Sequence, residues 1–189
     1  MEFKFNVPEN ETIARELMIS YLNVGIAAAP EWSPFGKRTT DSSIEMDWGE
    51  ESSKDILGNT YTKMKKPTMT QSFDPWDLSG GDKAQEKIAN LAIVEQNAQA
   101  LTNQDVMIAH FYLTESNSTA ASFAERYKSC MVKPSGLGGE GGGNLGMPID
   151  VTYGGERTVG TVTKSDDNTV TFTASSGGAS EAYLEVDDI

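Results

Sequence analysis

The only histidine of the chain, His110, has the side chain best suited to acid–base or metal chemistry. It stands in an apolar stretch, 106–113, on the face that it would share with Ile108 and Tyr112 in a strand. Catalysis needs an acid, a base, a nucleophile or a metal in mutual reach. Because the usual zinc sites need several ligands, a lone histidine predicts no such site. We therefore expect a packed core imidazole, with no metal and no cofactor.

The only cysteine, Cys130, excludes an internal disulfide and indicates synthesis in a reducing cytoplasm. Lys128 and Lys133 are near it in sequence, and cationic neighbours lower the pKa of a thiol. No histidine-based dyad is visible, however, and a buried cysteine in a strand is the better interpretation. The sequence thus predicts a protein that is not an enzyme and has no catalytic residues.

A glycine-rich segment, 134–148, contains the pattern G-x-G-x-x-G at Gly136, Gly138 and Gly141. In a dinucleotide site that pattern must link a strand to a helix, so that the helix N-terminus meets the pyrophosphate. Here a strand-like sequence follows, and no Lys-Ser or Lys-Thr completes a P-loop. We interpret the segment as a flexible surface connector. A small nucleotide-using enzyme remains a third hypothesis, which a parallel sheet would favour.

The formal net charge of −13 argues against one large class of partners, the nucleic acids. A strongly acidic protein repels the phosphate backbone, so DNA or RNA binding of the ordinary kind is not expected. The tight pairs Glu50–Glu51 and Asp166–Asp167 fall in predicted turns and do not have the spacing of a calcium loop. No apolar run is long enough to span a bilayer, and the N-terminus lacks the features of a secretory signal.

The clearest strand signal is at 42–48, where Ile44, Met46 and Trp48 alternate with polar residues. That pattern predicts a half-buried strand with an acidic outer face. A second extended stretch covers 61–73, and the polar segment 49–59 lies between the two. Together they predict a long hairpin arm at about 41–73. Because a lone two-stranded ribbon is marginal in water, such an arm is expected to gain order from neighbouring chains.

The other elements complete a mainly β (α+β) fold, a β-sandwich or small barrel that we treat as a single domain, 1–189. Asp82 and Gln85 predict a capped helix over about 83–102, with one apolar stripe on a sheet. The remaining expectations are strands at 106–113 (buried on both faces) and 123–132, a loop at 116–122, a hairpin of 149–153 with 159–163, a return strand at 169–173 and a last strand at 182–186.

The sequence resembles the tail tube proteins (major tail proteins) of tailed bacteriophages over about residues 12–173. The resemblance lies in 14–25 with Trp32-Ser-Pro-Phe-Gly36, in 123–130, and in the order of 138–143, 148–157 and 159–162. It implies rings, hexameric in this family, that stack into a hollow tube through which the genome passes without binding. It also implies a place in the virion tail and, as partners, other copies, the tape measure, the tail terminator and the baseplate or tip. No membrane insertion is expected.

If the chain forms such a tube, its acidic residues have a function in the tube wall. Carboxylates on the wall would repel the phosphates of passing DNA within about one Debye length, ~8 Å. The residues expected to face the lumen are Asp41, Glu45 and Asp47. Those expected to make arm contacts within one copy or between copies are Glu50, Glu51, Lys63 and Lys65. Those expected between rings are Gly138, Gly139, Gly141, Gly142 and Gly143. The alternative is another β-rich virion or surface module, such as a head decoration protein or an adhesin, which would not need a long arm.

Overall fold

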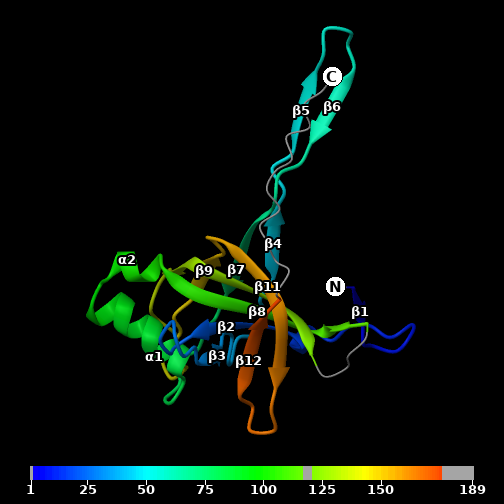
Figure 1. Ribbon diagram of the computed structural model, residues 1–189. Helices are drawn as coiled ribbons and strands as arrows, with labels where there is room; N and C mark the ends of the chain where they lie inside the picture. The colour runs from blue at the N-terminus through cyan, green and yellow to red at the C-terminus, as the bar shows by residue number, and fades with distance from the viewer. Residues whose placement is uncertain (1, 117–120, 176–189) are drawn as a thin grey trace.

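The structure, a computed structural model, describes residues 2–116 and 121–175 (Figure 1). The predicted strand at 182–186 and most of the predicted loop at 116–122 lie outside these residues. The mainly β class is confirmed, with α1 and α2 at one side of a large antiparallel sheet and a 3₁₀ turn, η1 (Arg15–Leu17), before β2. No helix in the described ranges is long and apolar enough to cross a membrane.

One ten-stranded sheet forms the body, and a separate two-stranded sheet forms the end of the arm. The ten strands are β1 (Phe3–Phe5), β2 (Met18–Asn23), β3 (Trp32–Pro34), β4 (Ile44–Asp47), β7 (Thr68–Phe73), β8 (Gln104–Glu115), β9 (Ser122–Pro134), β10 (Ile149–Thr152), β11 (Arg157–Lys164) and β12 (Val170–Ala174). The arm strands are β5 (Glu51–Lys54) and β6 (Thr60–Lys63).

The two longest strands, β8 and β9, pair with each other at the centre, and each has two further partners. The outer side of β9 pairs with β11 along its first half and with β10 along its second half. The predicted hairpin of 149–153 with 159–163 is therefore wrong, because β10 and β11 do not pair with each other. The chain instead passes Ser129 of β9 at Gly154, where an added Cβ would stand 2.6 Å from the Ser129 carbonyl oxygen.

Side chains of β2, β8 and β9 are buried on both faces of the sheet, as the sequence predicts for 106–113. Val106 and Ile108 belong to a large core, whereas Met107 and Ala109 belong to a smaller core on the other face. Strands β7 and β10 fold over the larger core and contribute apolar side chains to it. Its remaining members include Leu22, Phe35, Met69, Phe73, Trp76, Ala84, Ile88, Val132, Ile149 and Val151.

The predicted helix at 83–102 is broken into α1 (Lys83–Ala89), a π-helical turn η2 (Asn90–Val94) and α2 (Ala98–Leu101). The Asp82 cap is confirmed, since its carboxylate accepts from the Ala84 and Gln85 amides. Gln85 does not complete the capping box, because its side chain accepts from the Ser79 amide instead. The helix ends early because Gln96 adopts a left-handed conformation, with φ of 50°, and Asn97 then caps α2.

A buried polar cluster joins β8, β9 and β11 around the carboxylate of Glu125. His110 Nε2 lies 3.1 Å from Glu125 Oε1, and the Tyr127 hydroxyl and Arg157 Nε donate to Oε2 at 2.9 and 2.5 Å. The other ring nitrogen of His110 lies 2.9 Å from the Tyr112 hydroxyl. Burial alone would raise the pKa of Glu125, but the hydrogen bonds and charges of His110 and Arg157 together lower it to about 2.

This cluster generates a prediction about acid stability. A depressed folded-state pKa contributes stability above the unfolded pKa, and that stability is lost as the pH falls toward 2. A shift from 4.5 to about 2 corresponds to about 3 kcal/mol. We predict that Glu125→Gln loses about that much in urea unfolding at neutral pH and matches the unsubstituted protein near pH 2. The exposed Glu156→Gln is the control; equal losses at both pH values would contradict the assignment.

Candidate functional site: the arm and its root

The segment 41–73 forms a long hairpin that projects from the body, as predicted (Figure 1). Its base is the pairing of β4 with β7, and its outer part is the pairing of β5 with β6. The predicted polar tip at 49–59 is shorter than expected, because 51–54 continues the hairpin as β5 and only 55–59 form the turn. Two antiparallel strands thus extend away from the core. Among the described residues the outer edges of β4, β5 and β6 are unpaired, whereas the outer edge of β7 pairs with β10.

Apolar side chains are concentrated on this arm and are exposed. Six of the thirteen large apolar residues that are exposed among the described residues lie at 46–64: Met46, Trp48, Ile56, Leu57, Tyr61 and Met64. The predicted half-buried strand at 42–48 is confirmed at Ile44, which packs partly buried against the larger core, and is wrong at Met46 and Trp48, which are exposed. Its alternation is real, since Met46 lies opposite buried Met69, but Met46 remains 53% exposed. Among the described residues, no core covers these apolar side chains of the arm.

The turn at the tip is well ordered although it is exposed. The Asp55 carboxylate accepts from the amides of Leu57 and Asn59, both at 2.8 Å, from the Asn59 side chain at 3.0 Å and from the Tyr61 hydroxyl at 3.1 Å. The Asn59 side chain and these other donors lower the pKa of Asp55. Gly58, with φ of 85°, supplies the left-handed position that closes the turn.

The three residues predicted to face a lumen are exposed, but they do not form one row. Glu45 and Asp47 lie on β4 beside Thr70 and Thr68 of β7, on the face opposite Met46. Asp41 lies before β4, in the loop at the root of the arm. Which face of the arm meets a lumen stays a prediction.

Some of the contacts predicted for Glu50, Glu51, Lys63 and Lys65 are formed within one chain. Lys65 pairs with Glu51, and its backbone amide donates to the Trp48 carbonyl. Lys63 stands opposite Glu51 in the register of β5 and β6. Both partners of the Lys65–Glu51 pair are more than 60% exposed, so the pair contributes only about 0–1 kcal/mol. Glu50 is exposed, and contacts between copies remain untested.

The root of the arm is held by Arg15, which the sequence analysis did not identify. Its Nε and Nη2 atoms donate to the Ser42 carbonyl at 3.0 and 2.9 Å, and Nη1 donates to the Met18 carbonyl at 2.6 Å. Gln71 of β7 adds a second tie, donating to Ser42 Oγ at 2.9 Å and accepting from Ser20 Oγ at 2.7 Å inside the core. The arm therefore leaves the body in a direction fixed by hydrogen bonds on both strands.

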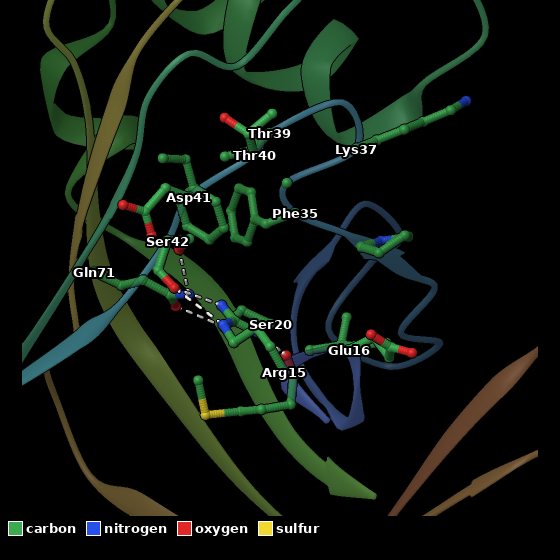
Figure 2. Close-up of a pocket in the computed structure, with 15 residues that line it drawn as sticks. Arg15, Glu16, Ser20, Phe35, Lys37, Thr39, Thr40, Asp41, Ser42 and Gln71 are labelled. Atoms are coloured by element: carbon green, nitrogen blue, oxygen red, sulfur yellow. Dashed lines mark hydrogen bonds between the residues drawn. The ribbon is translucent and has the colours of Figure 1, made fainter. Parts of the chain in front are cut away.

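A cavity of about 450 Å³ opens at the same root (Figure 2). Apolar groups form much of its wall, from β2, β3, the following loop and β7. They are Met18, Ile19, Pro34, Phe35 and Phe73. Charged side chains stand around them, namely Arg15, Glu16, Lys37 and Asp41. Apolar walls with a few polar groups are typical of sites that bind a small apolar group.

The glycine-rich loop is tied down at its base. Gly138 and Gly146 exchange amide–carbonyl hydrogen bonds of 3.0 and 2.7 Å, and Asn144 donates to Asp77 at 2.8 Å. The residues predicted to lie between rings, Gly138, Gly139, Gly141, Gly142 and Gly143, are exposed at the end of this loop. The loop leads into β10 and not into a helix, so it lacks the context that a dinucleotide site requires.

His110 and Cys130 have the structural positions that the sequence predicts. His110 is 8% exposed and engaged by Glu125 and Tyr112. Cys130 is fully buried, and burial raises the pKa of its thiol to about 12, so it stays protonated. Across residues 2–116 and 121–175 no group of three or more His, Cys, Asp or Glu side chains is arranged to hold a metal ion.

Comparison with protein families finds no match, and comparison with curated proteins finds none. Among solved structures, the chain is similar to the sheath/tube terminator of an extracellular contractile injection system (PVC), at 12% identity over 80% of this chain and 99% of that one, with a TM-score of 0.48. It is similar to a chain of the PVC sheath–tube complex, at 9% identity over 80% of this chain and 93% of that one, with a TM-score of 0.46. It is also similar to the anti-feeding prophage tube-terminating cap, at 16% identity over 82% of this chain and 95% of that one, with a TM-score of 0.45. At these scores the likeness carries no inference about function.

The Arg15 contacts predict how the arm responds when its root is loosened. Arg15→Ala removes three donors, so the amides of β4 should exchange with deuterium at least several-fold faster, while those of β8 and β9 stay protected. Lys37→Ala, at the same cavity, is the matched control because none of the hydrogen bonds or ion pairs found for the described residues involves its side chain. Unchanged exchange in β4 would show that Arg15 does not hold the arm.

Proposed function

We propose that this chain is a structural subunit that assembles with copies of itself into rings, and that the rings stack into a hollow tube of the phage tail-tube kind. The observation that carries the proposal is the projecting arm with its exposed apolar residues. Soluble monomers rarely leave contiguous apolar surface uncovered, and such surfaces mark interaction sites. Unpaired strand edges along the same arm invite pairing with another strand.

A second copy of the same chain is the simplest partner for such an arm, because it carries the same unpaired strand edges. If each arm pairs with the arm of the next copy around an axis, the edges are removed by closure. The family resemblance of the sequence favours six copies per ring. In that assembly Met46, Trp48 and Tyr61 would be covered by neighbouring arms, and the tape measure, the terminator and the baseplate or tip would meet the ends of the tube.

The charge of the chain fits a conduit for DNA. A net charge of −13 keeps phosphate from binding, and Glu45 and Asp47 form an exposed acidic edge along the base of the arm. In the proposed tube this edge faces the lumen, so the genome slides past without adhering. The protein acts without catalysis, and its location is the virion tail.

Electron microscopy of the purified protein in negative stain, over a concentration series, tests this function. We predict hollow tubes or stacked rings above a threshold concentration, with a lag that seeds abolish, because ordering the end of the glycine-rich loop costs entropy. Monodisperse monomers or trimers at every concentration, even with seeds, would contradict the proposal and favour a head decoration protein or an adhesin. A rise in melting temperature with a nucleotide would instead revive the enzyme hypothesis.

A further inference from the structure

The tip of the arm presents two aliphatic side chains that the described chain leaves bare. Ile56 is fully exposed and Leu57 is 80% exposed. They are held outward because Asp55 organises the turn through its hydrogen bonds to Leu57, Asn59 and Tyr61. A pre-organised apolar turn loses little conformational entropy when it is bound, which is the property of an interface anchor.

The cavity at the root of the arm has the size and chemistry to receive such an anchor. Its volume of about 450 Å³ is within the range of ordinary ligand sites, about 300–1,000 Å³. Phe35, labelled in Figure 2, gives it an apolar wall together with Phe73. Its charged lining is mixed, with Glu16 and Asp41 beside Arg15 and Lys37. No ion pair among the described residues involves Glu16, Asp41 or Lys54, so Lys54, beside the tip, is available to pair with either carboxylate. Tip and cavity are therefore complementary in apolar character.

We propose that the Ile56–Leu57 tip of one copy docks into the root cavity of a second copy. The inference rests on the proposed self-assembly and names the contact that drives it. The tip and the root are at opposite ends of one arm (Figure 1), so the contact joins two molecules head to tail. Such heterologous contacts produce rings or open stacks instead of closed pairs.

The docked tip would also contact the residue that orients the next arm. Arg15 lines the cavity and donates to Ser42 at the start of its own arm. Each docking event thus acts on the part of the receiving copy that must be in place before its own tip can dock. A lipid surface is the other partner for an exposed apolar tip. The root cavity favours a second copy, because its lining offers an apolar wall that can cover two aliphatic side chains.

Cysteine cross-linking between two differently tagged variants tests the contact. Leu57→Cys and Thr40→Cys, at the cavity, are mixed and oxidised; native Cys130 is buried and stays out of the reaction. We expect a cross-linked pair in at least tenfold greater yield than from Leu57→Cys mixed with Thr171→Cys, an exposed position on β12. Equal yields in the two mixtures would overturn the docking.

A second pair of variants separates docking from general loss of apolar surface. Ile56→Ser with Leu57→Ser should raise the concentration needed for assembly on the order of a hundredfold, because two buried aliphatic side chains are lost. The control, Ile93→Ser with Val94→Ser, removes an exposed apolar pair from η2 and should leave assembly unchanged. Equal effects of the two double variants would overturn the docking.

The outcomes also distinguish this inference from the function on which it rests. If the unsubstituted protein forms tubes but the cross-link is not specific, docking at the cavity is wrong and the tube function stands. If the protein never assembles, the function itself fails. If uncharged phosphatidylcholine vesicles sediment the protein, and the double serine variant at the tip stops this without affecting assembly, the tip is a membrane anchor and the docking is overturned.

Discussion

The constraint on which the rest of this structure depends is that the arm carries more apolar surface than the described part of the chain covers. A hairpin two strands wide has no interior, so Met46, Trp48, Tyr61 and Met64 are exposed among residues 2–116 and 121–175. Side chains on both faces of β8 and β9 are at or near zero exposure, and the other exposed large apolar residues of the described chain are dispersed over several segments. The arm thus holds six such residues within 46–64, and we propose that it is the surface through which the protein assembles.

The body of the protein can be understood as the support of that arm. Gln71 reaches from β7 into the core to Ser20, and Arg15 fixes Ser42 on the other strand, so both strands are anchored where they leave the sheet. The Glu125 cluster ties β8, β9 and β11 together behind this root. Rigid anchoring matters because an assembly contact made far from the core is useful only if its direction is fixed.

Local sequence patterns predicted the arm but not what covers it. The alternation at 42–48 predicted the strand and its acidic edge. Alternation indicates only that the two faces of a strand differ in polarity, and it does not indicate whether the apolar face is covered. Met46 was therefore expected to be half-buried and is exposed. Partner choice is also non-local. Nothing in the Gly154 turn reveals that β10 and β11 pair with different halves of β9. Likewise, no local signal marks Arg15 or Gln71, whose partners lie 27 and 51 residues away.

Sedimentation velocity of a variant in which a two-residue turn replaces residues 49–64 tests the central claim most directly. The account predicts that this variant keeps the melting temperature of the body, because β4 and β7 and both cores remain, and that it stays monomeric at concentrations where the full chain assembles. Assembly of the shortened variant at the same concentrations as the full chain would contradict the claim that the arm drives self-association.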